Sequence, residues 1–134
     1  NMILGASGEN IYPEDIEEVL NSNRFVAESV VTEEDGKLIA LVHFDTAALE
    51  EAYDEFKFKM SVSKEQLQQK MEEIQKDLVN YVNSKVNRFS KISKVVDNEG
   101  EFEKTPTKKI RRFIYDRSNK GENQVGANQN SEKK

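Results

Sequence analysis

A short basic stretch near the end of the sequence carries the side chains best suited to chemistry. The chain has a formal net charge of −5, yet residues 104–112 contain no acid and five cations: Lys104, Lys108, Lys109, Arg111 and Arg112. Cations gathered in this way create a local positive field that attracts an anionic partner. Pro106 fixes its own φ and lacks a backbone N–H, so we expect an extended segment before it and a new element after it. This break predicts a lysine held at a strand-to-helix junction.

The residues alone leave three roles open for this stretch. The first is a nucleic-acid or protein interaction module, in which the cations neutralise phosphates; the acidic remainder and the lack of interleaved aromatic residues disfavour it. The second is a lysine presented to an anionic transition state, because a positioned ammonium lowers the energy of developing negative charge. The third is a solvated run of charges, which composition alone favours.

Length and composition indicate one modest domain. The chain has 134 residues, of which 36% are apolar, and this is enough for one core but not two. The absence of Cys excludes disulfides, thiolate metal sites and cysteine nucleophiles. No apolar run approaches the roughly 20 residues of a membrane span, and we find no signal peptide. We predict an ordered domain over residues 1–117 and a disordered polar tail over 118–134.

The N-terminal residues predict a hairpin followed by a helix. Small residues at positions 5–8 separate a short apolar run from a return strand at 9–12, although a plain turn fits the composition equally well. Pro13 stands where a helix would begin, with acids in its first turn and apolar residues on one face. The helix is expected to end near residues 21–23.

The middle of the chain predicts a small sheet with helices packed on it. Two segments rich in β-branched residues, 25–32 and 37–44, flank Asp35-Gly36, a strong hairpin signal. Ser63 and Gln66 form a capping box for a helix of about six turns, for which packing on the sheet is favoured over a coiled coil. Another strand is predicted at 91–97, and a short helix through Ile110, Phe113, Ile114 and Tyr115. The fold class is therefore α+β, with a mostly antiparallel sheet.

The single histidine offers little for catalysis or metal binding. His43 lies at the end of the second predicted arm of the hairpin, with no nearby Cys, His or paired carboxylate. We interpret it as structural or merely exposed, and the sequence predicts no metal site.

Two separated segments together resemble one known family. Residues 8–17, Gly-Glu-Asn-Ile-Tyr-Pro-Glu-Asp-Ile-Glu, resemble the glycine-containing hairpin and helix that open the C-terminal domain of the adenylate-forming synthetases. This superfamily includes acyl-CoA synthetases, luciferases and the adenylation domains of peptide synthetases. Residues 104–112, Lys-Thr-Pro-Thr-Lys-Lys-Ile-Arg-Arg, resemble that domain's closing signature, Lys-Thr-x-Ser/Thr-Gly-Lys-Ile-x-Arg. The resemblance covers residues 1–117.

The resemblance implies roles for particular residues. Lys109 matches the lysine that enters the large domain's site during adenylation and contacts the substrate carboxylate and the ribose and phosphate oxygens. Gly8 and Glu9 match the loop that replaces this lysine after the small domain swings, and that lines the pantetheine tunnel during thioester formation. A glycine suits this loop because a thiol-bearing arm must pass the backbone without a Cβ in its way.

Other positions either match the family pattern or depart from it. Asn1 falls at the family's hinge position, usually Asp or Lys, so we expect the chain to begin at the domain boundary. Lys108 stands where many members have Gly, and Glu103 where many have Pro. Lys108, Arg111 and Arg112 are candidate phosphate contacts for ATP or CoA, and solvation of the surface is the alternative.

The implied parent enzyme is an acid–thiol ligase. The Thr-Pro-Thr form of the signature is similar to the long-chain fatty acyl-CoA synthetase branch, so a fatty acid, ATP and Mg²⁺ would yield an acyl adenylate, and CoA then a thioester. The chain lacks a phosphate-cradling loop, so ATP, CoA and Mg²⁺ belong to the full-length enzyme and none is expected on this domain alone. We expect the isolated domain to be inactive, its partner to be the missing N-terminal adenylation domain, not nucleic acid, and the location to be cytoplasmic or membrane-peripheral through the parent enzyme.

Overall fold

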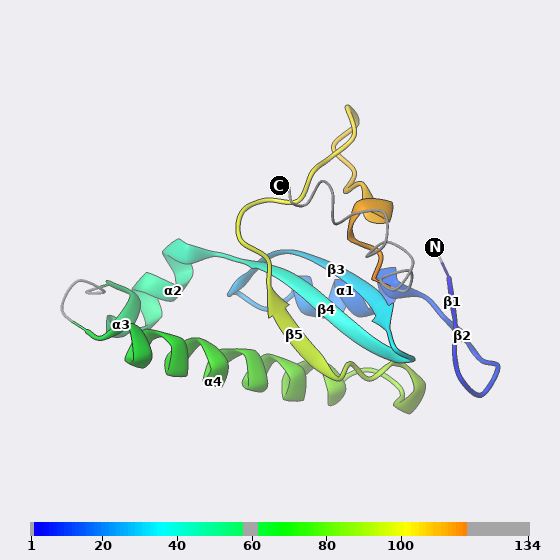
Figure 1. Ribbon diagram of the computed structural model, residues 1–134, viewed down its shortest axis with the longest axis horizontal. Coiled ribbons are helices and arrows are strands. Elements are labelled where there is room, and N and C mark those ends of the chain that lie inside the picture. Colours follow the sequence, from blue (N-terminus) through cyan, green and yellow to red (C-terminus); the bar gives the residue numbers. More distant parts are fainter. Residues whose placement is uncertain (1, 58–61, 118–134) are drawn as a thin grey trace.

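A three-stranded sheet forms the centre of the computed structural model, which describes residues 2–57 and 62–117 (Figure 1). The strands are β3 (Val26–Glu34), β4 (Lys37–Phe44) and β5 (Lys94–Asp97), in the order β3-β4-β5. β3 and β4 form the predicted antiparallel hairpin, and Asp35 and Gly36 at its turn both have positive φ, as a type I′ turn requires. The α+β fold class is confirmed.

The third strand departs from the antiparallel expectation. β5 runs parallel to β4, with Ala40 paired to Val95. Parallel neighbours need a crossover connection, and here the chain crosses through α2 (Thr46–Ala52), α3 (Asp54–Lys57) and α4 (Lys64–Asn83) before it returns as β5. α4 begins at the predicted capping box: Gln66 N–H donates to Ser63 Oγ, and Ser63 N–H to Gln66 Oε1.

The two faces of the sheet are covered by different kinds of structure. One face packs against α1 (Pro13–Asn21) and α4, which contribute buried residues such as Ile16, Leu20, Ile74 and Leu78. The opposite face carries Val30, Ile39 and Leu41, which pack with buried Phe102 and with the partly buried Ile110 and Tyr115. The predicted helices thus pack on one face only, and the chain that carries the basic stretch covers the other.

The chain ends differ in part from the sequence prediction. The N-terminal hairpin is present as β1 (Ile3–Leu4) paired with β2 (Asn10–Ile11). Two short 3₁₀ helices, η2 (Arg88–Ser90) and η3 (Arg112–Tyr115), lie before β5 and at the end of the basic stretch. The predicted C-terminal helix is only this one 3₁₀ turn, and its Phe113 is 72% exposed. The predicted tail, 118–134, and Asn1 lie outside the described residues. Within the described part of the chain, no helix combines the length and apolar character that a membrane span needs.

Candidate functional site

The basic stretch is a β-hairpin, which we call the basic hairpin (residues 103–111). Lys104 and Ile110 form an antiparallel bridge, and Arg111 N–H donates to the Glu103 carbonyl at 2.8 Å. At the tip, Thr105 N–H donates to the Lys109 carbonyl at 2.7 Å and Lys108 N–H to the Thr105 carbonyl at 2.8 Å. The strand-to-helix junction predicted from Pro106 is therefore wrong: Pro106 lies inside a tight turn that reverses an extended chain.

The turn explains both its proline and the strain at Lys108. These bonds match a type I turn followed by one left-handed residue, which favours Pro at its second position and Gly at its fourth. Pro106 occupies the second position, and Lys108 occupies the fourth with φ of 70°. Lys108 is the residue that stands where many members of the resembled family have Gly. The lysine therefore adopts a conformation that glycine adopts without a steric cost.

The N-terminal hairpin has the same backbone pattern. Gly5 N–H donates to the Glu9 carbonyl at 2.8 Å, Gly8 N–H donates to the Gly5 carbonyl at 3.0 Å, and Gly8 has φ of 91°. Glu9 lines a groove of about 330 Å³ together with Arg88 and Phe89, whereas Gly8 is not part of this lining. Figure 1 shows this hairpin (dark blue) and the basic hairpin (yellow to orange) pointing away from the body in different directions. The structure thus does not bring Lys109 together with Gly8 and Glu9.

Three of the five cations are engaged within the domain. Lys104 Nζ lies 2.5 Å from Oε2 of Glu28 and 3.7 Å from Oε1 of Glu101, and the hydrogen bond to Glu28 raises the pKa of the lysine. Arg111 Nη1 lies 3.5 Å from Glu103 Oε1, and its guanidinium stands over the ring of Phe113. The two groups are therefore held by their own hairpin and sheet.

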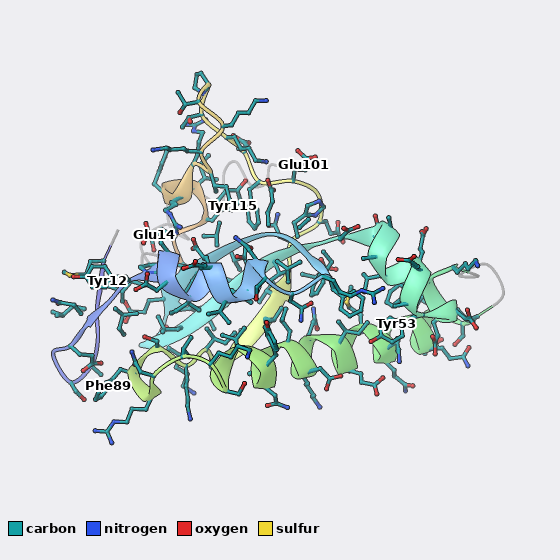
Figure 2. The ribbon with its side chains drawn as sticks, turned by 180° about the vertical axis from the view of Figure 1, so that it is seen from behind. Tyr12, Glu14, Tyr53, Phe89, Glu101 and Tyr115 are labelled. Atoms are coloured by element: carbon teal, nitrogen blue, oxygen red, sulfur yellow. The ribbon has the colours of Figure 1, made fainter. Side chains whose placement is uncertain are left out.

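Arg112 forms the most buried of these pairs. Its Nη1 donates to Oε2 of Glu17 at 2.7 Å, its Nη2 contacts Oε1 of the same carboxylate, and its Nε lies 3.8 Å from Glu14. Burial raises the pKa of the Glu17 carboxyl, while the hydrogen bonds from Arg112 and from Val31 N–H act in the opposite direction. The guanidinium proposed from sequence as a phosphate contact is thus already bound to a carboxylate of α1. Figure 2 shows Glu14 and Tyr115 where α1 meets the chain after the basic hairpin.

The other two cations, Lys108 and Lys109, occupy the tip of the hairpin. Both side chains are exposed, and neither amine forms an ion pair or hydrogen bond with any residue in 2–57 or 62–117. The five charges that look equivalent in the sequence therefore separate into three anchored and two presented ones. A presented ammonium is free to bind an anion on another surface.

Two glutamates of this region were not singled out by sequence reasoning. Glu28 on β3 and Glu17 on α1 accept hydrogen bonds from the two arms of the basic hairpin or its flanks. Glu17 was read only as an acid near a helix start, and Glu28 is 74 residues away from its backbone partner Phe102. No local pattern connects residues at such a separation. In the described part of the chain no cluster of three or more His, Asp or Glu is arranged to hold a metal ion.

Comparison with solved structures places this fold among acyl-CoA synthetases and other adenylate-forming enzymes, as the two motifs predict. A fatty acyl CoA synthetase of Mycobacterium tuberculosis is 26% identical over 85% of the chain, with a TM-score of 0.54. An acyl-CoA synthetase of Brucella canis is 20% identical over 90% (TM-score 0.58), and O-succinylbenzoate coenzyme A synthetase of Bacillus subtilis is 22% identical over 84% (TM-score 0.55).

The similarity concerns one part of each of those enzymes. The matched region makes up 18%, 19% and 18% of the M. tuberculosis, B. canis and B. subtilis chains, respectively. The chain thus spans about a fifth of the length of the structures it matches. No protein-family sequence model matches the chain, and no curated protein matches its sequence.

Proposed function

We propose that this chain is the C-terminal lid domain of an ATP-dependent acyl-CoA synthetase, and that Lys109 is its adenylation lysine. The observation that carries the proposal is the tip of the basic hairpin. There an exposed lysine that has no partner among the described residues projects from a fold shared with acyl-CoA synthetases, while Lys104 and Arg112 are tied to acids. A lysine whose amine is free and whose backbone is held by a tight turn suits delivery into a site on another domain.

The chemistry of adenylation explains why an ammonium is needed. The carboxylate oxygen of the substrate attacks the α-phosphorus of ATP, the bond to the β-phosphate bridging oxygen breaks, and pyrophosphate leaves with its electron pair. Negative charge gathers on the transferring oxygens, and a positioned cation in a site from which water is excluded is worth several kcal/mol there. Lys109 would supply this charge, and Lys108 beside it is a candidate phosphate contact.

The N-terminal hairpin would serve the second half-reaction. We propose that Gly8 and Glu9 face the pantetheine arm of CoA when the thiol attacks the acyl adenylate and AMP leaves. The separation of the two hairpins on this domain supports a rotation between half-reactions, because one placement cannot present both tips to the same point. Asn1, at the position of the family's hinge, would lie where such a rotation occurs.

The partner and the cofactors belong to the rest of the enzyme in this proposal. The described residues offer no donor set for Mg²⁺, so the metal and the nucleotide would be held by the N-terminal adenylation domain. The substrate would be a fatty acid: the Thr-Pro-Thr turn favours a long-chain acid, and the M. tuberculosis relative is a fatty acyl CoA synthetase.

The partial reactions of the full-length enzyme test the role of Lys109. Lys109→Ala should lower the rate of acyl adenylate formation by about 10²- to 10³-fold, the typical cost of removing one donor to a developing oxyanion. Thioester formation from supplied acyl adenylate and CoA should change by less than about threefold, since Lys109 no longer faces the site in that step.

The neighbouring lysine provides a matched control. Lys108→Ala removes another exposed charge from the same turn; because Lys108 is at most an additional phosphate contact, this change should reduce adenylate formation far less than Lys109→Ala. Equal losses in both half-reactions for Lys109→Ala would contradict the proposal. Activity measured across fatty acids of increasing chain length tests the substrate, and a preference for short or aromatic acids would exclude the long-chain assignment.

A further inference from the structure

The basic hairpin needs support from outside itself to hold a direction. Figure 1 shows it projecting from the body of the domain on the face of the sheet opposite α4. A two-stranded hairpin alone is at best marginally stable in water, and the hydrogen bonds inside residues 103–111 cannot fix its angle to the sheet. That angle is set by the two roots, where each arm joins the chain.

Glu28 holds the first root. Its Oε1 accepts from Phe102 N–H at 3.1 Å and its Oε2 lies 2.5 Å from Lys104 Nζ, so one carboxylate on β3 binds both the backbone and a side chain of this arm. Phe102 is 2% exposed and its ring packs edge-on against Tyr115 at 4.7 Å. The Tyr115 hydroxyl accepts from Glu103 N–H at 2.7 Å.

Glu17 holds the second root. Its carboxylate binds the guanidinium of Arg112 through both oxygens, and it accepts the N–H of Val31 on β3 at 2.7 Å. The Glu17 side chain is only 8% exposed, so α1, β3 and the end of the hairpin meet at a carboxylate that has little access to water. Arg112 lies three residues after Lys109, and a change at this root therefore acts directly on the arm that carries the lysine.

We propose that Glu17 and Glu28 are positioning residues that clamp the two roots of the basic hairpin and thereby aim Lys109. Neither glutamate contacts substrate; each acts through the hairpin. The proposal rests on the proposed function of Lys109 in adenylation. When a clamp is released, Lys109 samples more directions and a smaller fraction of encounters has the productive geometry, and a displacement of about 1 Å can cost 10²-fold in rate.

Amide hydrogen exchange on the chain itself tests the clamp without reference to activity. Glu17→Gln and Glu28→Gln keep an acceptor for Val31 N–H and Phe102 N–H but remove the charge that binds Arg112 or Lys104. We expect exchange of the Arg111 amide to rise by about tenfold or more, while amides in the β3–β4 ladder keep their protection. The control is Glu51→Gln, whose carboxylate pairs with Arg24 at 3.7 Å and is 83% exposed. Hairpin amides that exchange as slowly as in this control would overturn the clamp.

A second variant covers the case in which Glu17→Gln does not fold. Arg112→Lys keeps the positive charge but loses the two-pronged contact with the carboxylate. It should loosen the Arg111 amide in the same direction by a smaller factor. If Arg112→Lys folds and leaves that amide unchanged, the clamp at the second root is excluded.

A double-mutant cycle in the full-length enzyme separates positioning from a general structural effect. Glu17→Gln should lower adenylate formation about 10- to 100-fold in the wild-type background and less than twofold in the Lys109→Ala background, with thioester formation nearly unchanged in both. Equal factors in the two backgrounds, or no effect in the wild type, would overturn the inference. Failure of the proposed function looks different: Lys109→Ala itself would leave adenylation intact, while the exchange experiment still decides whether the clamp exists.

Discussion

The two hairpins of this domain have the same backbone conformation at their turns but carry different side chains at their tips. In each turn, the N–H of the first residue donates to the carbonyl four residues later. The fourth residue of each turn has positive φ: Gly8 in the first hairpin and Lys108 in the second. The flanking pairs, Leu4 with Asn10 and Lys104 with Ile110, occupy equivalent register positions. The same turn is thus built once from small residues and once around a proline.

The residue at the first position of the turn differs between the two hairpins, and so does the placement of the side chain four residues later, Glu9 or Lys109. The Glu9 carboxylate lies directly over Gly5, where an added Cβ would be 1.8 Å from Oε2. In the basic hairpin this position is Thr105, whose hydroxyl accepts from Lys109 N–H at 3.1 Å. A side chain therefore stands in the equivalent space, and the Lys109 side chain is exposed. One hairpin covers its backbone with an acid, and the other leaves a cation exposed.

Replacing the basic tip residue by its counterpart should have the largest effect. Lys109→Glu places a carboxylate where the proposed mechanism needs a cation, so adenylate formation in the full-length enzyme should fall by about 10³-fold or more. Pyrophosphate release in a single turnover measures this step. The reciprocal Glu9→Lys should spare adenylation, and a comparable loss of adenylation in Glu9→Lys would remove the functional distinction between the hairpins.

A side chain at the left-handed position of the first hairpin should destabilise it. Gly8→Lys imitates the second hairpin; a Cβ there meets no atom within 4 Å, so only the backbone conformation is penalised. We expect a loss of about 1–2 kcal/mol in the stability of this hairpin. Exchange of the Gly5 amide, which is bonded to the Glu9 carbonyl, reports it. An unchanged rate would show that the turn tolerates a side chain at no cost.

The reverse substitution should stabilise the second hairpin by a smaller amount. Lys108→Gly relieves the positive φ but adds conformational freedom to the unfolded chain, so the net gain is about 0.5–1 kcal/mol. Urea unfolding of the chain measures the difference in the free energy of unfolding between Lys108→Gly and the wild type. Lys37→Ala, which changes another exposed lysine, is the control. Destabilisation by Lys108→Gly would mean that the lysine side chain contributes more than its backbone conformation costs.

The weakest predicted effect is the pH dependence of the Lys104–Glu28 pair, which the first hairpin lacks because Leu4 stands at that position. The folded pKa of Lys104 is raised above its ordinary 10.5, so the pair stabilises the folded state fully below pH 10.5 and loses this contribution as the pH rises through the folded value. The stability difference between the wild type and Lys104→Met should be constant from neutral pH to about pH 9.5 and shrink above 10.5. A difference that shrinks already near neutral pH would contradict this assignment.

Much of the fold could be predicted because its signals are local. Asp35-Gly36 needs positive φ at two adjacent residues, Ser63 and Gln66 cap one helix end, and Pro13 begins another. The direction of β5 was not accessible in this way. Its residues alternate in the same manner in either direction, and the crossover through α4 decides that it lies parallel to β4.

For the basic hairpin, too, some features could be predicted from the sequence and others depend on tertiary contacts. Its turn residues, Thr-Pro-Thr-Lys, and its match to a synthetase signature are properties of the sequence, and they led to Lys109. The proline was interpreted as the end of a strand because Pro before a helix and Pro inside a turn have the same local preference, φ near −65°. The contacts beyond the turn distinguish the two cases.

Residue types and spacings were sufficient to place a cluster of cations, the turns at residues 5–8 and at Asp35-Gly36, and the class of enzyme that carries such motifs. They could not separate the five cations, because charge is a property of each side chain whereas partnership depends on distance in space. Folding places Glu17 and Glu28, 95 and 76 residues before their cations Arg112 and Lys104, against the roots of the hairpin. Lys109 remains without such a partner because no acid of the described chain reaches the tip. Lys108 and Lys109 become distinct from the other three cations only when folding has placed acids against Lys104, Arg111 and Arg112.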